Sequence, residues 1–332
     1  MWQVIGQDKI LSLLDYSLKI NAVAHAYLIV GPRHVGKGTL AFNLAQALNC
    51  DGPELPCGQC RSCQRILERK HADVTPVGLD SKTEIGIDDI RYLQRIANLP
   101  PYEGKYKVFI IDGAEYLSTE AANSLLKILE EPPQNVVWLL LAAEDGHLLP
   151  TIISRCQRLE LKPVPSEQVQ EALVNSYNVE TNRAKLLAQL CRGRLGWALS
   201  ALANDDILEQ RSQRIDRMVS LLTASLSQRF AYAQELASQF SQNRRTGAEI
   251  MEDWLDWWRD LMLIKGSCQE TIVNVDYQTA LEEQARGLSL SEINGFLTDL
   301  CLLQEEISRN VNPRLVLEWL MLNLPRKNSV KS

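Results

Sequence analysis

The chain has 332 residues, 45% hydrophobic and 23% charged, which is typical of a globular protein and excludes a disordered, collagenous or membrane-embedded one. At roughly 150 residues per domain, this length predicts two or three domains. The longest apolar run, residues 136–143, is far shorter than the ~20 residues of a membrane-spanning helix, and no secretory signal is readable at the N-terminus. We therefore expect a cytoplasmic protein with no membrane partner.

The charge and the cysteine content of the chain indicate which classes of function to expect. The net charge is −6, whereas proteins that bind DNA mainly through its phosphates are usually basic, so extensive DNA binding by this chain alone is not expected. Four of the eight cysteines lie within residues 50–63, and clustering of this kind in a reducing compartment favours a metal site over disulfides. Three single cysteines are expected in the core: Cys191, Cys268 and Cys301.

The first half of the chain alternates between strand and helix patterns. Buried strands are predicted at residues 26–30, 108–112 and 136–141. Helices are predicted at residues 8–21, 37–48 and 119–131. Because strands that alternate with helices form parallel sheets, the pattern predicts an α/β fold with helices on the faces of a parallel sheet.

The second half carries only helical patterns. From Pro163 onward we expect amphipathic helices with breaks at Gly193, Gly196 and residues 243–245, 266–267 and 310–313. Three domains are predicted: an α/β domain at 1–163, a small helical domain at 164–207 and an all-α domain at 208–332.

Two apolar stripes in the helical half have alternative interpretations. Trp254, Trp257 and Trp258 lie on one helical face, which favours core packing, although aromatic residues are also enriched at protein interfaces. A second stripe near the C-terminus leaves the same two alternatives open; it consists of Leu315, Trp319 and Leu322.

A phosphate-binding loop is predicted between the first strand and the helix that follows it. Residues 31–37 read Gly-x-x-x-x-Gly-Lys, and in this setting loop amides and a helix N-terminus can hold phosphates. The next residue is Gly38 instead of the Ser or Thr that binds Mg²⁺, and Thr39 lies about 100° further around the helix. The alternative is a vestigial turn. The candidate nucleotide-binding residues are Gly31, Gly36, Lys37, Gly38, Thr39 and Asp112.

Asp112 ends its strand where a nucleotide-binding protein of this kind places the acid that orients Mg²⁺. Gly113 follows it where a catalytic Glu is usual, and Glu115 comes two residues later. Alternatively, Asp112 only opens the turn after the strand. With two parts of the site altered, we do not expect ATP turnover by this chain alone.

The four clustered cysteines predict a structural metal site. Cys50, Cys57, Cys60 and Cys63 can surround one tetrahedral ion with no position left for water or substrate, which favours structural Zn²⁺, with iron as the alternative. The overlapping Cys-x-x-Cys pairs make a redox role less favoured. Basic residues follow at near-helical spacing and are interpreted as a solvated helix face; they are Arg61, Arg65, Arg69 and Lys70.

Several motifs together carry a family resemblance. They are residues 4–7, residues 25–28 running into Gly31, the inserted cysteines, residues 121–133, residues 154–156 and residues 312–315. Over essentially its full length the chain resembles the clamp-loader subunits of bacterial DNA polymerase III, which are AAA+ proteins. The resemblance implies a P-loop domain with a zinc-binding insertion, a small helical lid and a helical collar for oligomerisation.

Two kinds of subunit in that family fit the resemblance, the tau/gamma ATPase motor and the more rigid delta-prime stator. Gly38, Gly113 and Gly196 stand where the motor keeps three parts of its own ATP site, which favours the delta-prime kind. Arg155, in Ser-Arg-Cys, is intact, and the resemblance implies that it acts in trans as an arginine finger on a neighbouring ATP site. The alternative is an exposed arginine paired with a local carboxylate.

The resemblance also implies partners: tau/gamma and delta subunits in a hetero-pentamer, and, through the complex, the sliding clamp and primed DNA. The chain's own pocket is expected to bind ATP and Mg²⁺ weakly or not at all. One alternative is a self-sufficient ATPase in which Thr39 and Glu115 replace the missing groups. Another is a zinc-dependent nucleic-acid-binding module, which the pI near 5.4 disfavours.

Overall fold

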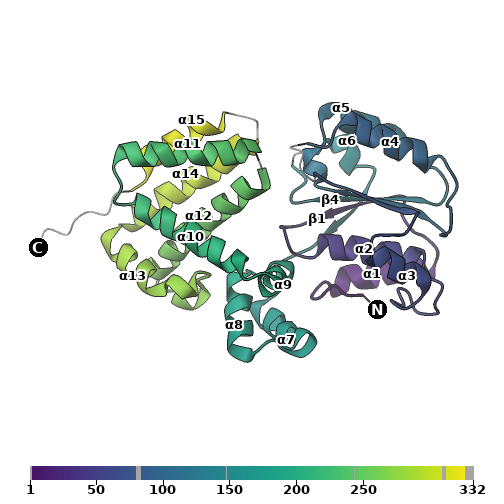
Figure 1. The fold of residues 1–332 in the computed structure, drawn as a ribbon, viewed down its shortest axis with the longest axis horizontal. Helices are drawn as coiled ribbons and strands as arrows, with labels where there is room; N and C mark the ends of the chain where they lie inside the picture. The colour runs from purple at the N-terminus through teal and green to yellow at the C-terminus, as the bar shows by residue number, and fades with distance from the viewer. Residues whose placement is uncertain (1, 80–83, 147, 243, 309–311, 326–332) are drawn as a thin grey trace, which may run out of the picture. The chain divides into compact units, whose positions relative to one another are not determined.

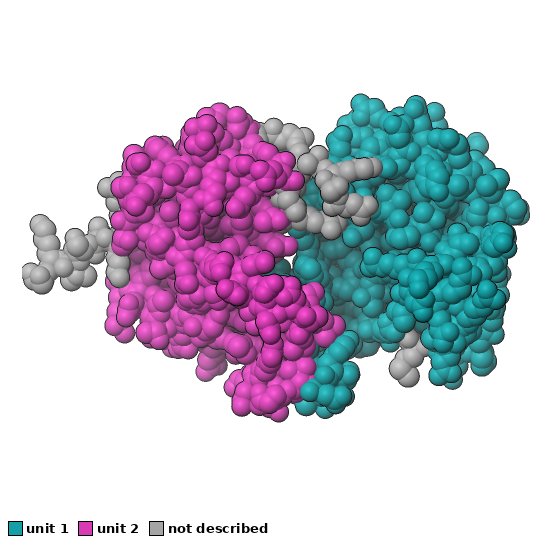
Figure 2. Space-filling view, viewed as in Figure 1, with its two compact units in different colours: residues 1–178, 193–197 teal, residues 179–192, 198–332 magenta. Residues whose placement is uncertain are grey.

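A computed structural model describes residues 2–79, 84–146, 148–242, 244–308 and 312–325. The chain forms two compact units, one of Met1–Asn178 with Gly193–Trp197 and the other of Val179–Arg192 with Ala198–Ser332 (Figure 2). Residues of the predicted middle domain, 164–207, belong to both units. The division into three domains stays a prediction.

The first unit is built on a five-stranded parallel sheet with the order β2-β3-β4-β1-β5. Its strands are β1 (Ala26–Val30), β2 (Val74–Val77), β3 (Lys107–Asp112), β4 (Val136–Ala142) and β5 (Gln157–Glu160). Its helices are α1 (Asp8–Lys19), α2 (Lys37–Leu48), α3 (Arg61–Leu67), α4 (Ile87–Ala97), the 3₁₀ helix η1 (Ala114–Tyr116), α5 (Thr119–Glu130), α6 (Pro150–Ile153) and α7 (Ser166–Tyr177). The predicted α/β class with a parallel sheet is confirmed.

Helices cover both faces of this sheet. Leu28 of β1 packs with α4, α5 and α6, whereas its neighbours Tyr27 and Ile29 pack with α1, α2 and α3 (Figure 1). Successive side chains of a strand point to opposite faces, and strands covered on both faces are apolar throughout. This is why the central strands were recognisable in the sequence as continuous apolar runs.

Both edge strands and α4 are absent from the elements that the sequence predicts. β2 has only four residues, including Pro76, which an edge strand tolerates because it needs fewer ladder hydrogen bonds. β5, at the opposite edge, reads Gln-Arg-Leu-Glu and buries only Leu159. Neither segment carries the apolar run that identified the central strands.

The second unit is helical throughout the residues that the structure describes. Its helices are α8 (Thr181–Leu190), α10 (Asp206–Leu221), α11 (Leu226–Gln242), α12 (Arg244–Lys265), the 3₁₀ helices η2 (Gln269–Thr271) and η3 (Val275–Tyr277), α13 (Gln278–Gly287), α14 (Leu290–Ser308) and α15 (Pro313–Asn323). α9 (Leu195–Ala203) contains Gly196, so the helix break expected there is wrong. No described helix is long and apolar enough to cross a membrane.

The tryptophan stripe of α12 forms the core of the second unit. Trp254, Trp257 and Trp258 are each 1% exposed, and the rings of Trp254 and Trp258 lie 6.0 and 4.4 Å from the ring of Phe296. The prediction of core packing is therefore confirmed for this stripe.

The stripe on α15 differs. Leu315, Trp319 and Leu322 are 63%, 44% and 57% exposed, while Leu317 and Leu320 between them are buried. This helix therefore packs on the unit with one face and presents a second apolar face outward.

Of the three cysteines expected in the core, Cys191 is buried, but Cys268 and Cys301 are exposed. Cys268 lies in the turn after α12, beyond the last helical residue. On α14, Leu300 and Leu303 occupy the buried face, so Cys301 faces outward. Apolar neighbours in the sequence do not predict the burial of these cysteines, because successive residues of a helix point in different directions.

Candidate functional site

The loop between β1 and α2 has the backbone shape that its glycines predict. Gly31 has φ 153° and Gly36 has φ 109°, and both values lie in the region that favours glycine. A Cβ atom on Gly31 would lie 2.4 Å from the backbone oxygen of Leu161. The close approach of these segments therefore requires glycine at position 31.

Lys37, the first residue of α2, is held by its own loop. Its Nζ donates to the backbone oxygens of Gly31 at 2.6 Å and Pro32 at 3.0 Å. A phosphate that bound here would compete with these two carbonyls for the ammonium group. In this structure, Lys37 therefore stabilises the conformation of its own loop.

The glycine after this lysine is not required by packing. A Cβ atom on Gly38 would meet nothing within 4 Å, so the structure has room for a Ser or Thr there. Thr39, one residue further, is exposed on α2. Gly38 therefore lacks the side chain that usually binds Mg²⁺, although the helix backbone at this position would accept one.

The glycine after Asp112 is different because the backbone depends on it. Asp112 ends β3 and is exposed, and Gly113 adopts φ 89° in the left-handed region. A glutamate at position 113 would be strained in this conformation. The turn itself therefore disfavours a catalytic side chain at this position.

Gly196 contacts the phosphate loop directly. Its N–H donates to the backbone oxygen of His34 at 2.9 Å. A Cβ atom on Gly196 would lie 2.8 Å from that same oxygen, closer than real Cβ contacts. The start of α9 therefore packs on the loop through backbone atoms, which leaves no room for an arginine side chain at position 196.

Glu115 belongs to the same neighbourhood as the loop. Its Oε1 accepts from the N–H of Ala143 at 3.2 Å, and its Oε2 is buried without a hydrogen-bond partner among the described residues. Burial raises the pKa of Glu115, and the nearby charges of Lys37 and Arg33 oppose this rise without cancelling it. The sequence alone left open whether Glu115 comes near this site.

Arg155 lies between α6 and β5 and is bound to residues of α5 and α6. Its Nη2 pairs with Oε1 of Glu130 at 2.7 Å, and its Nη1 donates to the backbone oxygen of Thr151 at 2.9 Å. The two side chains of the ion pair are 34% and 51% exposed, so the pair contributes about 0–1 kcal/mol. This local pairing is the contact that the alternative interpretation of Arg155 predicts.

The four clustered cysteines come together in one group. Their sulfur atoms all lie within 4.8 Å of one another, and Sγ of Cys57 lies 3.9 Å from Sγ of Cys63. Tetrahedral zinc with Zn–S bonds of ~2.3 Å places its sulfurs about 3.8 Å apart. The donor set, four sulfurs at this spacing, therefore fits a closed structural zinc site.

Backbone N–H groups point at these sulfurs. The N–H groups of Gly52 and Cys57 donate to Sγ of Cys50 at 3.3 and 3.4 Å, and that of Cys60 donates to Sγ of Cys57 at 3.3 Å. Hydrogen bonds from Cys60 and its neighbours lower the pKa of Cys57 to about 6, while burial raises the pKa of Cys63. N–H donors of this kind stabilise thiolates, the form that binds metal.

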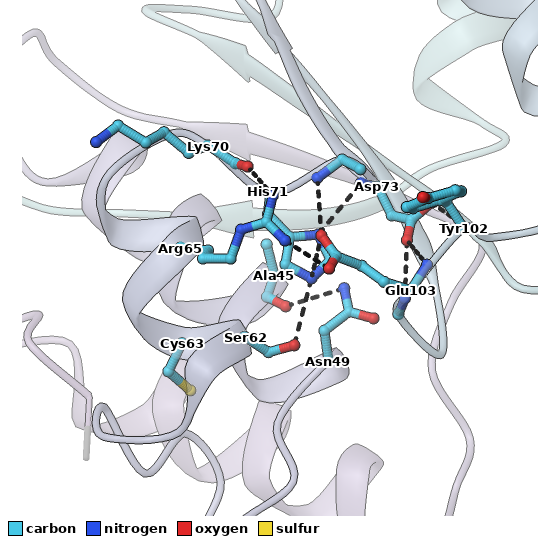
Figure 3. Close-up of polar contacts among 12 residues, drawn as sticks. Ala45, Asn49, Ser62, Cys63, Arg65, Lys70, His71, Asp73, Tyr102 and Glu103 are labelled. Atoms are coloured by element: carbon cyan, nitrogen blue, oxygen red, sulfur yellow. Dashed lines mark hydrogen bonds and ion pairs between the residues drawn. The ribbon is translucent and has the colours of Figure 1, made fainter.

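Asp73, before β2, fixes the loop beside the cysteine cluster (Figure 3). Its carboxylate accepts from the N–H groups of Tyr102, Glu103 and Gly104 at 2.7, 2.8 and 2.8 Å. Burial acts to raise the pKa of Asp73, but these donors outweigh it and lower that pKa. The role of Asp73 cannot be recognised in the sequence, since it depends on a loop about thirty residues away.

The same loop is tied to both sides of the cysteine cluster. Arg65 of α3 pairs with Glu103 at 2.5 Å, and Lys105 donates to the backbone oxygen of Cys50 at 2.5 Å. Asn49 accepts from the N–H of Tyr106 at 2.9 Å. In the predicted basic face, Arg65 thus pairs with Glu103, and Lys70 pairs with Glu68 at 3.0 Å.

The geometry defines a class: a P-loop α/β protein with appended helices and a group of four cysteines whose spacing fits a metal ion. A family model described as DNA polymerase III, delta subunit, matches residues 6–165, and one described as its C-terminal part matches residues 206–325. The chain belongs to this family of DNA polymerase III subunits.

The chain is also similar to individual proteins. The chain is 28% identical to DNA polymerase III subunit delta-prime of Bacillus subtilis, over 96% of each chain. It is 28% identical to subunit tau of the same organism over 95% of this chain, and 35% identical to subunit tau of Escherichia coli over 67% of it. It spans only 59% and 35% of the lengths of those two tau subunits. A solved gamma subunit-related protein from Thermotoga maritima aligns with 95% of this chain and 99% of its own at 19% identity and a TM-score of 0.47.

Proposed function

We propose that this chain is the delta-prime stator of a DNA polymerase III clamp loader and supplies Arg155 to the ATP site of a neighbouring subunit. The observation that carries the proposal is the contrast between its own altered phosphate site and the intact, partly exposed Arg155. An arginine finger stabilises charge that develops on the transferred phosphoryl group, and it can do so from another subunit.

The chain's own site supports a role without turnover. Gly113 has a left-handed backbone, and Gly196 contacts the phosphate loop so closely that a side chain there would collide. Lys37 is bonded to the carbonyls of its own loop. We infer that this pocket binds ATP and Mg²⁺ weakly or not at all, and that Gly31, Gly36, Lys37, Gly38, Thr39 and Asp112 are the remains of a nucleotide site.

The metal has a structural role in this proposal. Cys50, Cys57, Cys60 and Cys63 would hold Zn²⁺ with no ligand position open for chemistry. The ion would order the segment that precedes α3. Cys50 of that segment accepts from Lys105, and Arg65 of α3 pairs with Glu103, so both would help to hold the loop of Tyr102 and Glu103.

The proposed partners follow from the family and the acidic charge of the chain. We place the chain in a cytoplasmic hetero-pentamer with tau/gamma and delta subunits, where the complex loads the sliding clamp onto primed DNA. A net charge of −6 favours contact with DNA through the assembled complex over autonomous binding by this chain.

The test is DNA- and clamp-stimulated ATP hydrolysis by the loader reconstituted with tau/gamma and delta. We expect Arg155→Ala to collapse the rate and Lys37→Ala to leave it near that of the wild type. If Lys37→Ala collapses the rate and Arg155→Ala does not, the chain works as an ATPase through its own pocket. Steady ATP turnover by the purified chain would support the self-sufficient ATPase instead.

A further inference from the structure

Glu130, the last residue of α5, holds the guanidinium group of Arg155. Its Oε1 lies 2.7 Å from Nη2 of Arg155, and no other carboxylate pairs with Arg155 among the described residues. We propose that Glu130 is a positioning residue that orients Arg155 toward the phosphate of the neighbouring subunit. This inference rests on the proposed function of Arg155 and adds a second residue to it.

The guanidinium group is fixed from two elements of one packed core. Glu130 approaches from α5, while Thr151 of α6 accepts from Nη1 at 2.9 Å and the hydroxyl of Ser154 accepts from Nη1 at 3.5 Å. Leu129 of α5 and Ile152 of α6 are buried in the same apolar cluster. Movement of one anchor relative to the other is therefore restricted by packing.

The anchored group still has donors for a ligand. A guanidinium group carries five N–H donors, and the three contacts described leave one on Nε and one on Nη2. Two donors are what a phosphate group needs for a bidentate interaction. Glu130 therefore orders Arg155 without using the donors that a neighbouring phosphate would require.

The solvent exposure of the Arg155–Glu130 pair indicates that Glu130 orients Arg155 and does not prevent it from binding a phosphate. Arg155 is 34% exposed and Glu130 is 51% exposed, so water screens their attraction. A pair of this strength restricts the rotamers of a long side chain but does not compete with the several negative charges of a triphosphate. An arginine held in place loses less conformational freedom when the transition state forms.

The test compares Glu130→Ala with Glu131→Ala in the reconstituted loader. Glu131 is exposed, is adjacent in the chain and makes no contact with Arg155 among the described residues, so its substitution removes the same charge without removing the pair. For Glu130→Ala we expect a threefold to tenfold fall in kcat for DNA-stimulated ATP hydrolysis, with KM for ATP and loader assembly unchanged. Glu131→Ala should match the wild type.

Two further variants test whether Glu130 acts on ATP hydrolysis through its contact with Arg155. Glu130→Gln keeps an oxygen acceptor and should recover part of the lost kcat. Adding Glu130→Ala to Arg155→Ala should cause no further loss, because the two residues act through one contact.

A wild-type or higher kcat for Glu130→Ala, with a collapsed rate for Arg155→Ala, would overturn the role of Glu130 and leave the proposed function standing. An unchanged rate for Arg155→Ala would overturn the proposed function, and with it this inference. A lower kcat for Glu131→Ala equal to that of Glu130→Ala would assign the effect to net charge and overturn the positioning role as well.

Discussion

Arg229 of α11 shows how a single buried side chain can join three helices. It is 1% exposed and donates to four backbone oxygens, those of Leu221 and Leu222 at the end of α10 and those of Met321 and Leu324 at the end of α15. The last carbonyls of a helix have no partner within the helix, and burial makes their hydrogen bonds necessary. Arg229 therefore satisfies two helix ends at once.

We expect Arg229→Met to lower the free energy of unfolding of the second unit by about 3 kcal/mol or more, because it leaves several buried carbonyls without donors. Urea denaturation followed by tryptophan fluorescence measures this change, since the core of that unit contains Trp254, Trp257 and Trp258. Arg286→Met, at an exposed position of α13, is the control and should change stability little. Equal stability of the two variants would show that Arg229 is not needed.

Two glycines of the phosphate site should respond differently to the same substitution. Gly38→Ala places a methyl group in open space within α2 and should stabilise the chain by up to about 1 kcal/mol. Gly113→Ala must adopt φ 89° and should destabilise it by about 1–2 kcal/mol. Thermal unfolding of both variants beside the wild type measures the difference, and a Gly113→Ala chain as stable as Gly38→Ala would contradict it.

We expect Glu115 to make the free energy of unfolding depend on pH. Burial raises its folded pKa above the ordinary value of 4.5, so the folded chain binds more protons than the unfolded chain between these two pKa values. Stability is therefore lost as pH rises through the folded pKa. We expect Glu115→Gln to be more stable than the wild type at pH 8, with the difference shrinking toward pH 4.5. Urea unfolding at several pH values tests this, and a Gln variant that is less stable at pH 8 would contradict it.

Among the elements, the cysteine segment is the one that metal binding would stabilise most. Its four sulfurs form one closed group, and three of these cysteines precede or begin a helix of only seven residues, α3. Few apolar residues of this segment are buried, so metal binding would supply much of its folding free energy.

We expect the purified chain to contain one Zn²⁺ per molecule and Cys60→Ser to lose it, together with a fall in melting temperature. Cys268→Ser is the matched control, because Cys268 is exposed and lies in the other unit. Metal analysis by atomic absorption and thermal unfolding measure both effects. Zinc content that stays at one per chain in Cys60→Ser, or iron in the purified protein, would contradict the prediction.

Which elements the sequence could predict depended on how they are buried. The central strands β1, β3 and β4 are covered on both faces and appeared as apolar runs, and α2 begins and ends at the predicted residues. The edge strands lack such runs. In the candidate site, the spacing of the cysteines and of the phosphate loop was local information, whereas the contact of Gly196 with His34 and the pairing of Arg155 with Glu130 required the fold.

At the scale of the whole molecule, the two units rest on different kinds of packing. The first buries the two faces of a parallel sheet, and the second surrounds the tryptophans of α12 with helices. In the second unit, α15 has an apolar face with residues 44–63% exposed beside a buried face. We expect this outer face of α15 to contact a neighbouring subunit in the proposed hetero-pentamer.

Substituting Trp257 and Trp319 by alanine compares the buried core of the second unit with the exposed apolar face of α15. Trp257→Ala leaves a cavity in the core and should cost about 3–5 kcal/mol of unfolding free energy. Trp319→Ala removes a 44%-exposed side chain and should cost far less in the isolated chain, while weakening co-elution with tau/gamma and delta in gel filtration. A Trp319→Ala chain that assembles as well as the wild type would exclude this face of α15 from the contact between subunits.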